Sequence, residues 1–136
     1  MNETDSARLL EAACAALPRA YAPYSHFPVG AAVRCKDSAT FTGCNVENAS
    51  FGLTICAERV AICTAIAAGH TDVQALAVVS ETDPPAPPCG ACLQVLSEFA
   101  KPECLVLVAP RTRLNKPSVY RLADLLPVRF LLENGR

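Results

Sequence analysis

Apolar residues near the start of the chain recur at the spacing of one helical face. They fall at i, i+1, i+4, i+5 and i+8, namely Leu9, Leu10, Ala13, Cys14 and Leu17. Side-chain oxygens at Thr4 to Ser6 are suited to capping the start of a helix, and Pro18 prevents its continuation. The pattern therefore predicts an amphipathic helix over residues 4–17.

The next apolar positions predict a hairpin and then a second helix. Residues 29–35 and 40–46 favour two short strands, with Lys36 to Ser38 as the polar turn between them. Residues 56–68 are rich in alanine and are followed by Gly69, a residue type common just after a helix end. We therefore expect a sheet that begins with two antiparallel strands.

In the second half of the chain, apolar runs alternate with a helical pattern. Residues 73–79 form a short, largely apolar run, which is typical of a strand buried on both faces. Four prolines predict a loop over residues 83–88, and a helix is expected over residues 89–99. The remaining expectations are a strand over 105–109, a short strand over 119–121, and a short helix or turn over 122–126. Strands that alternate with helices favour an α/β domain with a mixed sheet, and 136 residues are enough for one domain, 1–136.

Charge and composition narrow the classes of function. The chain is 51% hydrophobic, which excludes a disordered role, and its net charge is −1, which argues against nucleic acid as a partner. Residues 1–8 lack a basic segment followed by an apolar run, so no signal peptide is expected. No apolar run is long enough to span a membrane. We therefore expect a cytoplasmic protein without a membrane partner.

Eight cysteines are many for a short chain in a compartment where thiols stay reduced. Two motifs stand at the expected starts of the two central helices, Cys56-Ala57-Glu58 and Pro88-Cys89-Gly90-Ala91-Cys92. Helix starts favour thiolates, and three protein ligands with one open position are typical of a catalytic zinc. Cys56, Cys89 and Cys92 are therefore the predicted ligands of one Zn²⁺. The other five cysteines are expected to fill the core: Cys14, Cys35, Cys44, Cys63 and Cys104.

Glu58 is placed to exchange protons beside such a metal. A carboxylate near a metal-bound water can accept a proton and pass it to a substrate. A ligand-x-Glu segment followed by Pro-Cys-x-x-Cys is a known signature of zinc deaminases, in which three cysteines are an accepted variant. The structural alternative, a closed zinc site or plain core, leaves Glu58 without an explanation.

With these motifs the chain resembles the cytidine deaminase family in its small homotetrameric form. The likeness extends over nearly the whole chain and includes Tyr24 to Ala32, Gly43 to Ala49 and Leu125 to Pro127. It implies a three-layer α-β-α sandwich with a mixed five-stranded sheet, one Zn²⁺ per subunit, and active sites shared within a homotetramer. It also implies deamination of cytidine and 2′-deoxycytidine to uridine and 2′-deoxyuridine in pyrimidine salvage.

The resemblance assigns substrate and supporting residues as well. Phe27 would pack against the pyrimidine, and Asn45 and Glu47 would bind ribose hydroxyls. The remaining assignments are Ala57 and Phe130 as substrate contacts, Phe130 reaching a neighbouring subunit, and Gln94 as support for the zinc site. From spacing alone, Asn45 and Glu47 share one face of a strand end, which suits two adjacent hydroxyls, but Asn45 could instead cap a turn and Phe27 could belong to the core.

Arg59 is expected to offset the charge of the metal site. Three thiolates on Zn²⁺ leave a net charge of −1, and a hydrogen bond from Arg59 to a ligand sulfur would withdraw electron density. The resemblance supports this role, although Arg59 could also be an ordinary surface arginine. Two positions depart from the family pattern, which has a small residue at Arg129 and often a tyrosine at Phe51.

Other functions remain open at this point. A deaminase of bases in tRNA or single-stranded DNA uses similar motifs, but it needs a basic, aromatic groove that this chain lacks. A deaminase of an antibiotic nucleoside would share the fold, but the sugar-binding pair Asn45 and Glu47 disfavours it. A zinc-stabilised interaction module without activity would have four protein ligands and no open position.

Overall fold

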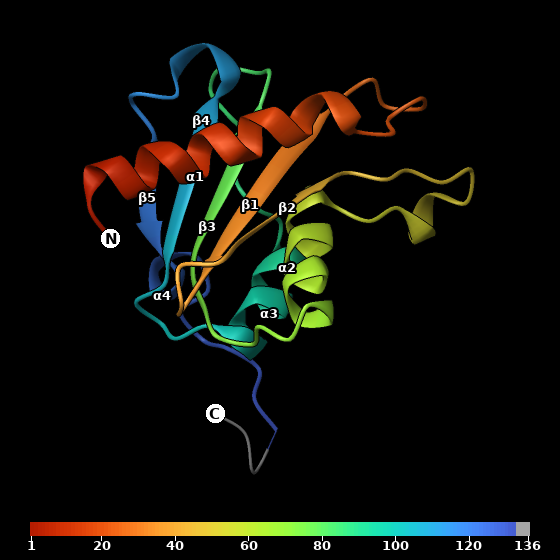
Figure 1. Cartoon of the computed structure of the whole chain (residues 1–136). Coiled ribbons are helices and arrows are strands. Elements are labelled where there is room, and N and C mark those ends of the chain that lie inside the picture. The colour runs from red at the N-terminus through yellow and green to blue at the C-terminus, as the bar shows by residue number, and fades with distance from the viewer. Residues whose placement is uncertain (133–136) are drawn as a thin grey trace.

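The computed structural model describes residues 1–132 and forms one α/β sandwich (Figure 1). Within residues 1–132, four helices and five strands follow in the order α1 Glu3–Ala16, β1 Val29–Cys35, β2 Thr40–Cys44, α2 Ala57–Ala67, β3 Val73–Ser80, α3 Gly90–Phe99, β4 Leu105–Pro110, β5 Ser118–Arg121 and α4 Leu122–Leu125. Short 3₁₀ turns span Leu17–Arg19, Phe51–Leu53 and Arg111–Arg113. None of the helices within residues 1–132 is long and apolar enough to cross a membrane.

The five strands form one mixed sheet in the order β2-β1-β3-β4-β5. Strands β3 and β4 are parallel, and the pairs β1–β2, β1–β3 and β4–β5 are antiparallel. The parallel pair requires a crossover, and α3 supplies it. The expected three-layer sandwich with a mixed five-stranded sheet is confirmed.

Helices cover both faces of this sheet (Figure 1). On one face, α1 buries Leu9, Leu10 and Ala13 mainly against alanines of the central strands, together with Val79 and Leu107. On the other face, α2 and α3 form the larger core, which includes Ile62 and Leu96. Strand β3 is therefore buried on both sides, which explains its nearly continuous apolar sequence.

Two glycines allow the helices to approach the sheet closely. A Cβ atom at Gly30 would lie 2.0 Å from the carbonyl oxygen of Ala13 in α1. A Cβ atom at Gly43 in β2 would lie 2.4 Å from the backbone nitrogen of Ala61 and 2.7 Å from the carbonyl oxygen of Ala57 in α2. Gly43 thereby sets the distance between β2 and the first turns of α2, where the zinc motif begins.

The element boundaries differ from expectation at two informative places. The cap of α1 is Asn2, not a residue between Thr4 and Ser6: its side chain accepts from the backbone of Asp5, whose carboxylate accepts from the Asn2 backbone. Strand β2 ends at Cys44 rather than at residue 46, and Val46 pairs instead with Ile55 through an isolated bridge. This second difference shapes the candidate site.

Candidate metal centre and active site

Three cysteine sulfurs converge where α2 and α3 begin. Cys56 is the N-cap residue of α2, Cys89 is the N-cap residue of α3, and Cys92 lies buried in the first turn of α3. Their Sγ atoms lie within 4.8 Å of one another, and those of Cys89 and Cys92 are 3.5 Å apart. A tetrahedral zinc with Zn–S bonds of about 2.3 Å requires sulfurs about 3.8 Å apart, so this donor set fits the ion.

The cluster leaves a coordination position open. Within residues 1–132, no fourth histidine, cysteine, aspartate or glutamate joins the three sulfurs. Three protein ligands are the number expected for a catalytic zinc site, whereas structural sites use four. The arrangement therefore disfavours a zinc-stabilised module without chemistry.

Positive charge and helix ends surround the sulfurs. Arg59 Nη2 donates to the Sγ atom of Cys56 at 3.4 Å, as the sequence predicts. Hydrogen bonds from the Cys92 thiol and from Arg59 hold the pKa of Cys56 well below its usual range. Cys92, which donates to Cys56 and is desolvated, has a raised pKa. Arg59 is thus an internal counter-charge of the cluster and not an ordinary surface arginine.

Glu58 lies in the first turn of α2, two residues after Cys56, and its residue surface is only 6% exposed. This burial raises the pKa of its carboxyl group, and the negative charge of Cys56 raises it further. A buried carboxyl beside a three-sulfur site with an open position can hold and transfer a proton. Ala57, between the two residues, is completely buried.

A backbone bridge joins the metal centre to the loop that follows β2. Val46 and Ile55 exchange two backbone hydrogen bonds, each 2.9 Å long, and Ile55 directly precedes Cys56. The neighbours of Val46 are Asn45 and Glu47, the two predicted sugar-binding residues. Irregular chain after β2 therefore brings these residues beside the start of α2.

The side chain of Asn45 holds the loop that carries Phe27. Its Oδ1 atom accepts from the backbone nitrogen of Val29, and its Nδ2 atom donates to the carbonyl oxygen of Phe27, both at 2.9 Å. Asn45 is only 8% exposed, so its buried amide connects the end of β2 to the loop. Phe27 itself is half-buried.

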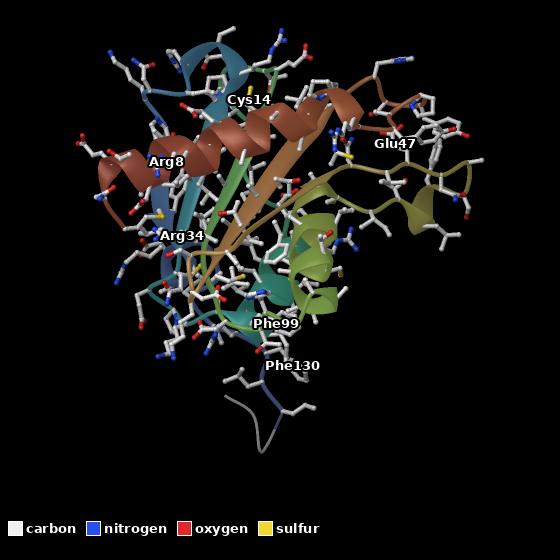
Figure 2. The ribbon with its side chains drawn as sticks, viewed as in Figure 1. Arg8, Cys14, Arg34, Glu47, Phe99 and Phe130 are labelled. Atoms are coloured by element: carbon white, nitrogen blue, oxygen red, sulfur yellow. The ribbon has the colours of Figure 1, made fainter. Side chains whose placement is uncertain are left out.

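Glu47 contacts the same loop further along (Figure 2). Its carboxylate accepts from the backbone nitrogens of Tyr24 and Ser25, at 3.0 and 3.1 Å, and from the Ser25 hydroxyl. These donors lower the pKa of Glu47, the Ser25 hydroxyl most strongly. The structure thus brings Phe27, Asn45 and Glu47 together, while their contact with a sugar or base stays a prediction.

Ser25 belongs to this group, although sequence reasoning gave it no role. Its hydroxyl donates to Glu47, and its Oγ atom accepts from the backbone nitrogen of Phe27 at 3.0 Å. Serine is common in turns, and no periodicity separates this serine from others. The only available signal is its place between Tyr24 and Phe27, in the segment Tyr24 to Ala32 that resembles the family.

Gln94 in α3 contacts the backbone of Phe130 in the C-terminal segment. The Nε2 atom of Gln94 donates to the carbonyl oxygen of Phe130 at 3.2 Å, and the Phe130 residue is 68% exposed. Support of the zinc site by Gln94 and contact of Phe130 with substrate both stay predictions.

The cysteines outside the metal cluster have different environments. Cys35 and Cys104 are buried, as expected for core residues, and burial raises the pKa of Cys104 to about 12. Cys14 and Cys44 are half-buried. Cys63 is exposed on α2, so the prediction of a core role is wrong for it, because the alanine-rich helix gave no clear polar face.

Comparisons with known proteins agree with this geometry. The model of the cytidine and deoxycytidylate deaminase zinc-binding region matches residues 3–108. A cytidine deaminase of Halalkalibacterium halodurans is 49% identical over 130 residues, covering 96% of this chain and 97% of the relative. One of Mycobacterium tuberculosis is 42% identical over 134 residues, covering 98% and 96%. The crystal structure of cytidine deaminase from Burkholderia pseudomallei has a TM-score of 0.85 at 50% identity, covering 90% of this chain and 97% of that chain.

Proposed function

The chain belongs to the cytidine and deoxycytidylate deaminase family, and on that premise we propose that it hydrolyses cytidine and 2′-deoxycytidine to uridine and 2′-deoxyuridine. One water is consumed and one ammonia is released, so atoms balance. The observation that carries the proposal is the buried carboxyl of Glu58 in the same helical turn as Cys56, beside three sulfurs with no fourth ligand in residues 1–132. We further propose that residues 1–136 act as one domain in the cytoplasm, in pyrimidine salvage.

Cys56, Cys89 and Cys92 would hold one Zn²⁺ per chain. When bound, zinc supplies a Lewis acid that lowers the pKa of water in its open position. Arg59 withdraws charge from Cys56 through its hydrogen bond, which counters the electron-rich character of three thiolates. Gln94, two residues after Cys92, is proposed to steady the first turns of α3.

Glu58 is the proposed acid and base. It accepts a proton from the water that attacks C4 of the cytosine ring, and it delivers that proton to ring N3. It then takes the remaining proton from the new C4 hydroxyl and passes it to the exocyclic amino group. The C4–N bond breaks, ammonia leaves, and the hydroxyl oxygen becomes the C4 carbonyl. One carboxyl can serve both transfers because N3 and the amino nitrogen are attached to the same carbon.

The loop and strand residues beside the centre are proposed to hold the nucleoside. Phe27 packs on the pyrimidine, Ala57 contributes backbone at the helix start, and Asn45 and Glu47 bind sugar hydroxyls. Glu47 accepts three hydrogen bonds from the loop, and a carboxylate has about four lone-pair sites, so one remains for a hydroxyl. Phe130 is proposed to complete the site of a neighbouring copy in a homotetramer.

The decisive experiment follows the loss of cytidine absorbance as uridine forms, with zinc content measured on the same samples. We expect activity that disappears on zinc removal and returns on its addition. Glu58→Ala should retain zinc and lose about 10²-fold or more in kcat. Glu11→Ala, on the exposed side of α1, is the matched control and should be unchanged.

Two outcomes would overturn the proposal. Zinc-loaded protein without activity on cytidine or deoxycytidine would exclude it. Tight, salt-dependent binding of a single-stranded oligonucleotide, together with deamination of its cytosines, would favour a nucleic-acid deaminase instead.

A further inference from the structure

The C-terminal segment after α4 is anchored to α3 by two side chains. Arg129 Nη1 donates to the carbonyl oxygens of Ser97 and Ala100, at 3.1 and 3.0 Å. Gln94 Nε2 donates to the carbonyl oxygen of Phe130 at 3.2 Å. The segment has no helix or strand of its own between residues 126 and 132, so these contacts determine its path (Figure 1).

Arg129 lies at the C-terminal end of α3, where the helix has no basic residue. The last carbonyl oxygens of a helix have no partner within the helix and carry partial negative charge. The last turn of α3 contains no basic residue, and Ala100 at its C-cap is already extended. The guanidinium of Arg129 therefore satisfies two carbonyl groups that the local sequence leaves open.

This anchoring holds the backbone of Phe130 on the side of α3 that faces away from the metal centre of its own chain. Gln94 follows Cys92 by two positions, which is about 200° around a helix with 3.6 residues per turn. Because Cys92 faces the cluster, Gln94 and the Phe130 carbonyl bound to it lie on the other side of α3. Figure 2 accordingly shows Phe130 at the lower end of α3, well away from Glu47.

We propose that Arg129 is a positioning residue that fixes the direction in which Phe130 is presented to the substrate site of a neighbouring copy. The inference rests on the proposed function, in which Phe130 completes that site. Phe130 lies next to Arg129 in the chain, so the two bonds of Arg129 restrict the backbone from which the exposed ring projects. A large cation thus anchors this segment where the family resemblance leads one to expect a small residue.

Steady-state kinetics test the role in substrate binding. Arg129→Ala should raise the KM for cytidine roughly tenfold, corresponding to about 1.4 kcal/mol, with a smaller change in kcat. Arg129→Lys, which keeps a donor for the carbonyls, should recover part of this loss. Arg113→Ala removes a different arginine, which pairs with Asp83 and, within residues 1–132, does not contact the C-terminal segment, and should leave the KM unchanged.

A double variant separates positioning from plain helix capping. If Arg129 acts through Phe130, adding Arg129→Ala to Phe130→Ala should raise the KM no further. If the two effects on the KM add in full, Arg129 acts independently of the ring and the proposal fails.

A fluorescence measurement tests the anchoring without enzyme activity. The chain contains no tryptophan, so Phe130→Trp introduces a single reporter at the position in question. Adding Arg129→Ala should lower the fluorescence anisotropy of this tryptophan, whereas Arg113→Ala should not. Unchanged anisotropy would overturn the positioning role. If Arg129→Ala lowers the anisotropy but the zinc-loaded wild type does not deaminate cytidine, the anchoring is supported and the proposed function is wrong.

Discussion

The Ser25 hydroxyl donates to the carboxylate of Glu47, and its oxygen accepts from the backbone nitrogen of Phe27. Two residues assigned to opposite ends of the nucleoside, the sugar and the base, are thereby connected through one serine. Asn45 and Glu47, which follow the end of β2, hydrogen-bond to the backbone of the loop from Tyr24 to Val29. The position of Phe27 accordingly depends on polar contacts made some twenty residues away in sequence.

We expect Ser25→Ala to raise the KM for cytidine roughly tenfold with little change in kcat, because it loosens the loop and leaves Glu58 untouched. Ser25→Thr, which retains the hydroxyl, should stay close to the wild type. Steady-state kinetics on both variants check this. An Ala variant with unchanged KM would mean that the backbone bonds to Glu47 position the loop on their own.

The lowered pKa of Glu47 predicts a specific pH dependence of stability. The pKa of Glu47 lies below its usual value of 4.5 because its neighbours stabilise the ionised carboxylate. These neighbours are the Ser25 hydroxyl, the backbone donors of Ser25 and Tyr24, and His26. This contribution is complete above the unfolded-state pKa and is lost as the pH falls through the lower folded-state value.

Denaturant unfolding of the wild type and of Glu47→Gln, at several pH values, measures that contribution. The difference in free energy of unfolding should be constant at neutral pH and should shrink as the pH falls below about 4.5. Protonation of the cysteine ligands affects both proteins and cancels in the difference. If the difference in free energy of unfolding stays constant down to the lowest pH, ionisation of Glu47 does not stabilise the loop.

Gly43 offers a test of how the sheet positions the metal centre. Any Cβ atom there would overlap the backbone of α2 at Ala57 and Ala61, so Gly43→Ala must displace the helix that carries Cys56 and Glu58. We expect a loss of roughly 1–3 kcal/mol in stability and weaker zinc binding. Gly52→Ala is the matched control, since a Cβ atom at Gly52 meets nothing within 4 Å. Equal zinc affinity in all three proteins would show that α2 can move without disturbing the cysteines.

Much of the fold could be predicted because its signals are local. Hydrophobic runs and the proline loop located the strands and helices of the core within a few residues, and the two cysteine motifs located the cluster of three sulfurs. The contacts that complete the site are not local: Ser25 reaches Glu47, and Arg129 reaches Ser97. Such pairings depend on how irregular segments fold back onto regular ones, and no periodicity encodes them. The exposed position of Cys63 likewise follows from the orientation of α2, which the few polar residues of this alanine-rich helix do not specify.

The Nη2 atom of Arg59 lies 3.4 Å from the Cys56 sulfur, so removal of this guanidinium tests its effect on the metal site. Arg59→Gln should keep zinc bound, because all three sulfurs remain, but should lower kcat about tenfold or more, on the scale of changes to groups that support metal ligands. Its Nε atom is buried and has no hydrogen-bond partner within residues 1–132. The positive charge of Arg59 beside the sulfurs therefore matters more than the number of hydrogen bonds that it makes. Arg59→Lys therefore recovers activity in part if charge dominates, and recovers none if the direction of the Nη2 donor dominates. Turnover equal to the wild type at full zinc content in Arg59→Gln would show that the two helix N-termini alone offset the three thiolates.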